Sequence, residues 1–242
     1  MRNFYLVIPV RLESSRLPKK VMLEIKKKTI LEWIYLKCQK SVNKKNIYIL
    51  TQNKEIVTFC KEKKINCFLT KKTLTGTDKI FEFSKFYKAK FYINVQGDEI
   101  FFDTKLLKKV ISFAKKNPSK LINCYAEIRD KKEYFSQNVP KMVFDINSNL
   151  LYSSRAPIPM NKSGEFSKAY KQVCIYSFPL KQLKHFGKLK KKTKFENIED
   201  IEINRFLELG FKILLIKSKG SIRAIDTIED YRFAKKNFEN YY

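Results

Sequence analysis

The chain has 242 residues, of which 44% are hydrophobic and 14% aromatic, a composition that can bury a core and that excludes intrinsic disorder. Its 51 lysines and arginines outnumber its 24 acidic residues, which gives a formal charge of +27 and excludes a neutral or acidic surface. The charge favours an anionic partner such as nucleic acid, a membrane face or a phosphorylated small molecule, although codon bias would produce the same scattered lysines.

The sequence offers no candidate for a membrane-spanning helix. Charge-free stretches such as residues 146–154 and 172–180 are far shorter than the roughly 20 apolar residues that a span requires. The apolar run 4–10 is not followed by a signal-peptide cleavage site, which favours a buried strand. The five cysteines form no C-x-x-C pair and no zinc-site spacing, and this favours a reducing cytoplasm.

Strands and helices alternate through the first half of the chain. Apolar runs predict strands at residues 4–9, 46–50, 66–69 and 91–95. Helical periodicity predicts helices at residues 30–40 and 54–63, at 78–87, and after a cap at Asp103 or Thr104. Thr29 and Glu32 have the spacing of a capping box at the first of these helices. The alternation predicts an α/β fold with a doubly wound, mostly parallel sheet and helices on both faces.

From about Leu121 the pattern changes. Strands predicted at 141–144 and 150–153 flank a turn-rich pentapeptide and together indicate a hairpin. We expect residues 160–171 to form a mobile loop and residues 172–178 to form the next strand. The remaining elements expected are a helix over 196–209, a strand over 211–216 and a last helix that begins with Thr227 and Asp230. We therefore expect one domain over residues 1–242, a Rossmann-like sheet with an inserted β-hairpin dimerisation subdomain at about 141–178.

The turn after the first strand is strongly basic. Ligands of doubly wound sheets bind beyond the carboxyl ends of the strands, and residues 10–20 carry Arg11, Arg16 and Lys20 there but no glycine. Arginine forks and lysine charges can bind phosphate groups in place of the backbone N–H groups of a glycine-rich loop. A solvated basic loop is the alternative interpretation.

Two acidic residues follow predicted strands. Asp98 comes after Gln96-Gly97, where the glycine permits close backbone approach and the carboxylate suits a Mg²⁺ ion shared with phosphate oxygens. Asp226 precedes Thr227, which already caps the last helix, so its carboxylate is free to be a second metal ligand. The alternatives are an ordinary turn acid at 98 and electrostatic support of the last helix by Asp226.

Six short motifs occur in one order along nearly the whole chain. They are IPVRLESSRLPKK at 8–20, TGTDK at 75–79, VQGDEI at 95–100, YSSRAPIP at 152–159, CIYSF at 174–178 and IDTIEDY at 225–231. Together they resemble the motifs of the 3-deoxy-manno-octulosonate (Kdo) cytidylyltransferases, or CMP-Kdo synthetases, which are relatives of the CMP-sialate synthetases. Six elements in the correct order are far more specific than any one of them.

The resemblance implies that CTP activates a 3-deoxy-ulosonic acid to a CMP-sugar and pyrophosphate, for lipopolysaccharide or capsule synthesis, with Mg²⁺ as cofactor and a homodimer as the assembly. Arg11 and Lys20 match catalytic phosphate-binding positions, while Asp98, also catalytic, and Asp226 match the metal ligands. The substrate-binding positions that the resemblance implies are Arg16, Thr75, Gly76, Thr77, Gln96, Arg155, Gln172, Tyr176 and Glu202. Among them, the TGTDK motif would help to hold the cytidine, and Gln96, Arg155, Tyr176 and Glu202 would line the acid-sugar site, with Arg155 on the sugar carboxylate.

The departures from the family pattern concern the sugar. The histidine of the family's H-x-G-I-Y strand is Gln172 here, and its glycine is Cys174. In addition, Val10, Lys79 and Ile100 replace an alanine, an arginine and a proline. An amide in place of an imidazole changes the donors and acceptors near the sugar, so Kdo, an amino-substituted Kdo and another ulosonic acid all remain open.

The sequence has features of two other classes of function. A nucleic-acid-binding module is favoured by the charge and by aromatic residues among basic ones at 85–90 and 231–242, but the sequence carries no recognised nucleic-acid motif. A catalytically inactive homologue is disfavoured because both metal carboxylates are present. Nucleophilic catalysis would depend on the only histidine, His185, which we expect to be exposed and without a catalytic role.

Overall fold

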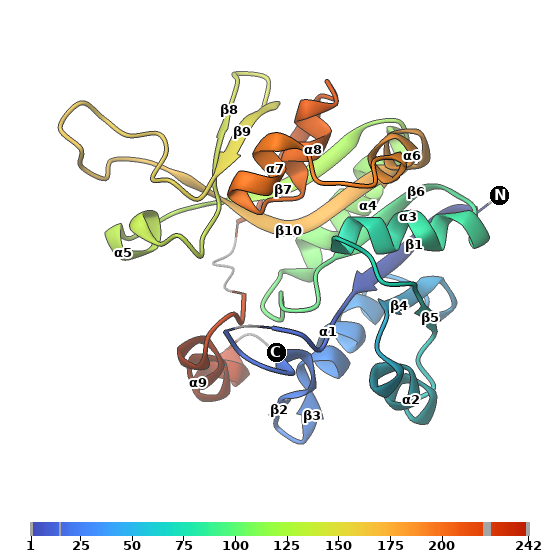
Figure 1. Cartoon of the computed structure of the whole chain (residues 1–242). Coiled ribbons are helices and arrows are strands. Elements are labelled where there is room, and N and C mark those ends of the chain that lie inside the picture. Colours follow the sequence, from blue (N-terminus) through green and yellow to red (C-terminus); the bar gives the residue numbers. More distant parts are fainter. Residues whose placement is uncertain (1, 15, 220–223, 241–242) are drawn as a thin grey trace.

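A nine-stranded β-sheet forms the framework of the computed structural model, which describes residues 2–14, 16–219 and 224–240 (Figure 1). Seven strands lie side by side in the order β11–β7–β10–β6–β1–β4–β5, and the β8–β9 hairpin pairs with β10. The strands of this sheet are β1 (Arg2–Pro9), β4 (Ile47–Thr51), β5 (Cys67–Leu69), β6 (Ala89–Val95), β7 (Leu121–Glu127), β8 (Lys141–Phe144), β9 (Leu150–Ser154), β10 (Tyr170–Pro179) and β11 (Ile213–Lys217). All neighbouring pairs in the row of seven are parallel except those of β10, which confirms the mostly parallel sheet.

Helices cover both faces of the sheet because alternate strand residues point to opposite sides. Leu6 and Ile8 of β1 belong to the same buried cluster as apolar residues of α1 (Ile30–Gln39), α2 (Lys54–Glu62), α4 (Thr104–Lys116) and α9 (Ile228–Asn237). Tyr5 and Val7 face the other layer, which contains α3 (Gly76–Phe86), α6 (Leu180–Lys188) and α8 (Ile203–Glu208). The smaller elements are α5 (Lys131–Phe135), α7 (Lys194–Glu199), the β2–β3 ribbon (Glu24–Ile25 and Lys28–Thr29) and three 3-10 turns, η1 (Lys20–Met22), η2 (Lys44–Asn46) and η3 (Phe238–Asn240).

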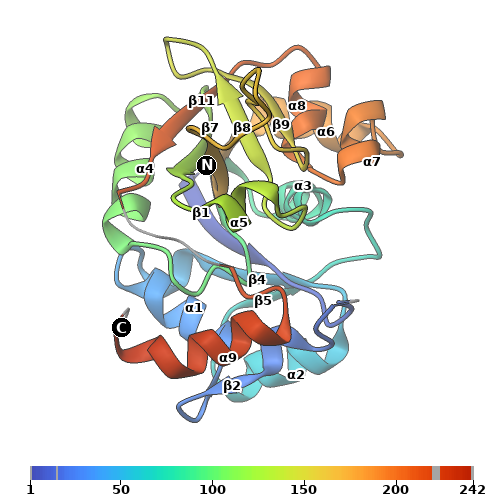
Figure 2. The ribbon, with the colours of Figure 1, turned by 90° about the vertical axis from the view of Figure 1, so that its left-hand side faces the viewer.

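The last helix returns to the first part of the chain. α9 lies beside α1, at the end of the molecule opposite the β8–β9 hairpin (Figure 2). Phe238, just after α9, packs against Trp33 of α1 with the rings tilted and 4.7 Å between their centroids, and Tyr231 donates a hydrogen bond to the carbonyl of Glu24. This packing brings the segment before α9 to the carboxyl end of β6.

Most of the predicted helix caps are present. Thr227 and Asp230 form the reciprocal capping box at α9, and Asp103 rather than Thr104 caps α4. Thr29 accepts the hydrogen bond from Glu32 N that begins α1, but the Glu32 carboxylate pairs with Lys63 instead of returning to Thr29. Only half of that predicted capping box therefore forms.

The predicted helix over 196–209 is wrong as one element, since it is divided into α7 and α8. Asp200 between them has a φ of 50°, in the left-handed region that interrupts a helix. The carbonyl oxygens of Glu199 and Asp200 accept hydrogen bonds from the side chain of Arg155 at 2.5 and 3.2 Å. Arg155, which follows the hairpin, thus donates to the carbonyls that would accept backbone hydrogen bonds in a continuous helix.

The inserted hairpin is narrower than predicted. β10 lies within the expected insertion, yet it pairs with both β6 and β7 and is a central strand of the main sheet. Of the nine strands, only β8 and β9 lie outside the row of seven (Figure 1). In the described ranges, every helix is too short or too polar to cross a bilayer.

Candidate active site

One large cavity opens at the carboxyl ends of the parallel strands. Its volume is about 1470 Å³, and its walls come from the turns after β1 and β6, the start of α3, strand β10 and the segments before α8 and α9. The predicted site residues that line it are Arg11, Arg16, Lys20, Thr75, Gly76, Gln96, Asp98, Arg155, Gln172, Tyr176, Glu202 and Asp226. Thr77 is buried and is not among them. Ser15 of the basic motif lies outside the described residues.

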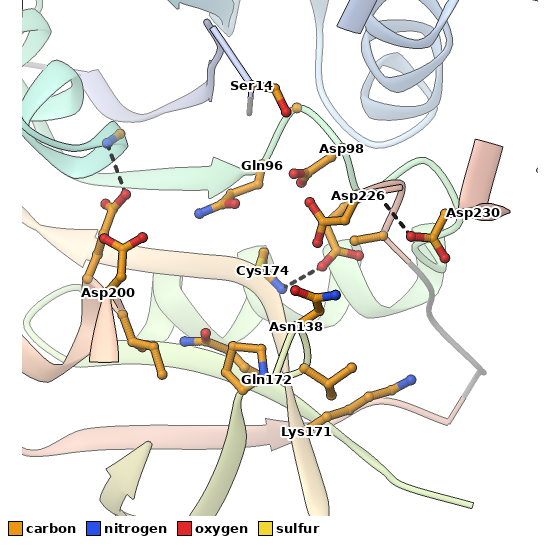
Figure 3. A pocket seen from close by; sticks show the side chains of 18 of the residues that line it. Ser14, Gln96, Asp98, Asn138, Lys171, Gln172, Cys174, Asp200, Asp226 and Asp230 are labelled. Atoms are coloured by element: carbon orange, nitrogen blue, oxygen red, sulfur yellow. Dashed lines mark hydrogen bonds between the residues drawn. The ribbon is translucent and has the colours of Figure 1, made fainter. Parts of the chain in front are cut away.

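Backbone contacts bring the two acidic segments together. The N–H of Ile225 donates to the carbonyl of Asp98 at 3.1 Å, so Asp226 lies next to the turn that follows β6. A Cβ atom on Gly97 would be 2.4 Å from Val10 Cγ1, which explains why a glycine is needed where this turn passes the end of β1. The carboxylates of Asp98 and Asp226 consequently face the same space (Figure 3).

Lys20 lies between these two carboxylates. Its Nζ atom is 2.5 Å from Asp98 Oδ2, 2.9 Å from Asp226 Oδ1 and 3.2 Å from the carbonyl of Ile225. Burial by itself would lower the pKa of the Lys20 ammonium, but the charges of Asp98 and Asp226 outweigh burial and raise it above its ordinary value. Arg16 adds a second positive charge, 3.2 Å from Asp226.

The converging oxygens of Asp98 and Asp226 fit a divalent cation that prefers oxygen ligands. Mg²⁺ is commonly bound by one or two carboxylates together with substrate phosphates and water. Within the described part of the chain, no group of three or more His, Cys, Asp or Glu side chains is placed to hold a metal ion. The donor set therefore suits a metal ion whose coordination a phosphate substrate completes.

A second part of the cavity is formed by the N-terminus of α3. The helix begins at Gly76, earlier than the predicted 78, because Thr75 and Asp78 form a reciprocal capping box. The carboxylate of Glu202 accepts hydrogen bonds from the N–H groups of Gly76 at 3.0 Å and Thr77 at 2.8 Å. Glu202 thus binds the turn of the TGTDK motif, although the sequence predicted it on the acid-sugar side.

Arg155 is held by backbone carbonyls. Besides its bonds to the carbonyls of Glu199 and Asp200, it donates from Nη1 to the carbonyl of Gln137 at 2.8 Å. Its own N–H donates to the carboxylate of Glu199 at 2.8 Å. The guanidinium lines the cavity in this fixed orientation, with two of its five N–H groups left for a ligand.

Gln172 has a defined orientation as well. Asn123 donates from Nδ2 to the carbonyls of Val173 and Ile175, so its Oδ1 atom must be an acceptor. Gln172 Nε2 donates to that oxygen at 3.1 Å, next to the bulge in β10. One N–H of the Gln172 amide is therefore engaged with the protein, and its Oε1 atom and second N–H are left for a ligand.

The sequence analysis missed several charged residues of the cavity. Lys79, treated above only as a departure, is buried and donates to Gln52 at 3.0 Å, and Lys171 forms an ion pair with Glu133. Lys171 could have been found from the sequence, because a lysine at the start of an apolar strand is unusual. The hydrogen bond from Arg16 to Asn138 could not, because no sequence pattern near either residue indicates it. His185 is exposed on α6, edge-on to Phe211, and does not line the cavity.

Comparisons with known proteins agree with this geometry. The model of the family described as cytidylyltransferase matches residues 5–213. The 8-amino-3,8-dideoxy-manno-octulosonate cytidylyltransferase of Shewanella halifaxensis is 30% identical over 244 residues, covering 96% of this chain and 97% of the relative. The 3-deoxy-manno-octulosonate cytidylyltransferase of Francisella philomiragia is 30% identical over 251 residues, with 99% and 100% coverage.

Among solved structures, a CMP:2-keto-3-deoxy-manno-octonic acid synthetase complexed with CTP superposes with a TM-score of 0.88. It shares 23% of its sequence with this chain and covers 98% of it, while 99% of the other chain is matched. At this identity the likeness establishes a common fold, which confirms the Rossmann-like α/β class.

Proposed function

Because this chain belongs to the cytidylyltransferase family, we propose that it transfers CMP from CTP to the anomeric hydroxyl of Kdo or a closely related 3-deoxy-ulosonic acid, for lipopolysaccharide or capsule synthesis. The observation that carries the proposal is the convergence of Asp98, Asp226 and Lys20 at one place in the cavity. The relatives named above support this class of acceptor, since their names give Kdo and its 8-amino analogue as substrates.

The chain's residues can supply positioning and charge for this reaction. The anomeric hydroxyl releases its proton to solvent as its oxygen attacks the α-phosphorus of CTP. The bond from that phosphorus to the bridging oxygen breaks, and pyrophosphate leaves with the electron pair. Arg11, Arg16 and Lys20 lie where they can neutralise the triphosphate as charge develops on its oxygens. The resemblance to the Kdo cytidylyltransferases implies a direct displacement, which needs no covalent enzyme intermediate.

We propose Asp98 and Asp226 as the residues that hold Mg²⁺. When bound, this ion would neutralise phosphate oxygens and lower the pKa of the attacking hydroxyl. Lys20 holds the two carboxylates together with its ammonium group until the substrate is bound. Arg155 and Gln172, on the opposite wall, are the proposed contacts of the acid sugar, and Thr75 and Gly76 those of the cytidine.

The activity is tested by measuring pyrophosphate release from CTP with Kdo, its 8-amino-8-deoxy analogue and N-acetylneuraminate. We expect release with at least one of the first two acids in the presence of Mg²⁺ and none without an acid. The absence of release with all three, together with salt-dependent binding to nucleic acid, would favour the nucleic-acid-binding alternative instead.

We propose a cytoplasmic location. All five cysteines are free thiols in the structure, although Cys67 and Cys174 are only partly buried. Free, partly accessible thiols persist in a reducing compartment.

Substituting Gln172 with histidine is expected to change the ranking of ulosonic acids by kcat/KM about tenfold or more, with KM for CTP nearly unchanged. The reason is that Gln172 has a carbonyl oxygen and a second N–H beside the one that Asn123 binds, whereas a neutral imidazole has only one N–H donor and one acceptor nitrogen. Steady-state kinetics with Kdo and 8-amino-Kdo measure the effect. An unchanged ranking of the two acids would show that the sugar does not contact residue 172.

We also propose a homodimer formed through the β8–β9 hairpin. In the described part of the chain, β9 pairs in the sheet with β8 alone, and Ile146 and Leu151 of the hairpin are 99% and 60% exposed. We expect a sedimentation mass of twice 28.8 kDa at micromolar concentration, and a shift toward 28.8 kDa for Leu151→Asp. A wild-type mass of 28.8 kDa would contradict the dimer.

Glu202→Gln is expected to raise KM for CTP roughly tenfold and to leave KM for the sugar within twofold. The carboxylate accepts two N–H groups at the start of α3, and an amide can accept only one while its own NH₂ group opposes the other. Loss of one charge-assisted hydrogen bond costs about 1.5–3 kcal/mol, which is enough for this change. An effect confined to the sugar would restore the acid-sugar role predicted from the sequence.

A further inference from the structure

Arg205 of α8 is a charged residue in the interior of the protein. Its side chain is completely buried, and its Nε and Nη2 atoms donate to the two carboxylate oxygens of Glu196 at 2.5 and 2.6 Å. Nη1 donates to Asp78 Oδ1 at 3.1 Å and to the carbonyl of Phe186 at 3.4 Å. The guanidinium also stacks on the ring of Phe186 at 3.7 Å.

The contact with Asp78 connects Arg205 to the cavity. The other oxygen of Asp78 accepts hydrogen bonds from Thr75 N at 3.1 Å and Thr75 Oγ1 at 2.9 Å. Thr75 lines the cavity next to Gly76. A continuous series of hydrogen bonds therefore runs from Arg205 through Asp78 to the turn that begins α3.

The same helix supports this turn from a second point. Glu202 and Arg205 are three residues apart at the start of α8, a spacing that places them on the same side of a helix. Glu202 binds the N–H groups of Gly76 and Thr77, and Arg205 binds the capping residue Asp78. α8 thus holds both the backbone and the cap of a turn that lies 125 residues earlier in the chain.

We infer that Arg205 is a positioning residue for the nucleotide, which acts through Asp78 to hold the Thr75–Gly76 turn in the geometry that binds CTP. This inference rests on the proposed function, because it assumes that the turn contacts CTP. A buried charge with only a packing role would be costly, since an apolar side chain of similar volume could replace it. The bidentate fork lets one side chain hold Glu196 and Asp78 at once, which a lysine point charge cannot reproduce.

The test compares Arg205→Lys with Asn204→Ser. Asn204 is the neighbouring residue on α8 and is equally buried, but it donates to the carbonyl of Ser153 on β9 and does not bond to the α3 turn. We expect Arg205→Lys to raise KM and Kd for CTP about tenfold, with kcat and the sugar KM within threefold. Asn204→Ser should lower the melting temperature while leaving both constants for CTP unchanged.

Equal CTP affinity in Arg205→Lys and wild type, or an equal loss in Asn204→Ser, would overturn the inference. If Arg205→Lys does not fold, Asp78→Asn decides the question from the other end of the series, since its amide cannot serve both Thr75 and Arg205 as acceptor. Unchanged CTP affinity in that variant would equally overturn it. Isothermal titration of wild type with CTP separates this failure from that of the proposed function, because a wild-type chain that does not bind CTP contradicts the function itself.

Discussion

Replacing Asp98 with asparagine is expected to lower the turnover number by on the order of a hundredfold or more, as measured by pyrophosphate release. The substitution keeps the size of the side chain but removes one of the two negative charges that converge on the proposed metal position. It also leaves Lys20, which is 2.5 Å from the Asp98 carboxylate, with only Asp226 as an acidic partner. An excess of chelator should have the same effect on the wild-type enzyme.

The matched control for this variant is Asp103→Asn. Asp103 is five residues further along the same loop, caps α4 and does not line the cavity. Asparagine is as good an N-cap as aspartate, so activity and stability should be retained. Full activity of Asp98→Asn, or of the wild type in excess chelator, would disprove the two-carboxylate metal site.

Replacing Lys20 with methionine is expected to have two opposite effects. Turnover should fall by a hundredfold or more, because a positive charge next to the phosphates is lost. Binding of Mn²⁺ in the absence of nucleotide should become at least about tenfold tighter, because the Lys20 ammonium now occupies the place where the carboxylates of Asp98 and Asp226 converge. Without it, two uncompensated carboxylates would attract a divalent cation.

The mechanistic consequence is that CTP should strengthen metal binding in the wild type by drawing Lys20 to its phosphates. Lys19→Met is the matched control, since Lys19 is 60% exposed, pairs with Glu55 and lies outside the cavity lining. Isothermal titration or electron paramagnetic resonance of Mn²⁺ with each variant, with and without CTP, measures the effect. Unchanged or weaker Mn²⁺ binding by Lys20→Met would refute the counter-ion role of Lys20.

Elements whose formation depends on neighbours in the chain were predictable from the sequence. The first strand over 4–9 is a continuous apolar run that ends at a proline, and the structure places β1 at Arg2–Pro9. The capping box of Thr227 and Asp230 is complete within one helical turn. Asp98 is the third residue after β6, so its position at the carboxyl end of a buried strand was determined by local pattern alone.

Elements that distant residues shape were not predictable in this way. The helix expected over 196–209 is interrupted because Arg155, more than forty positions earlier, binds the carbonyls of Glu199 and Asp200. β10 has the alternation of an ordinary strand, yet only its pairing with β6 and β7 shows that it belongs to the main sheet. Sequence periodicity indicates which face of a helix or strand is apolar, but it does not indicate which other element packs against that face.

The residues of the candidate site were predictable from the sequence, but the contacts between them were not. The sequence by itself determined which residues could do chemistry, since residue type and the end of a strand are local properties. The resemblance of its six motifs to those of the Kdo cytidylyltransferases selected Arg11, Lys20, Asp98 and Asp226 from among them. The tertiary structure decided which of them touch: Lys20 bonds to carboxylates 78 and 206 positions away, and Glu202 bonds to a helix start 125 or more positions earlier. Such contacts depend on how the strands and helices pack in three dimensions. A hydrogen bond requires a distance of about 3 Å between two atoms, and their separation along the chain does not determine that distance.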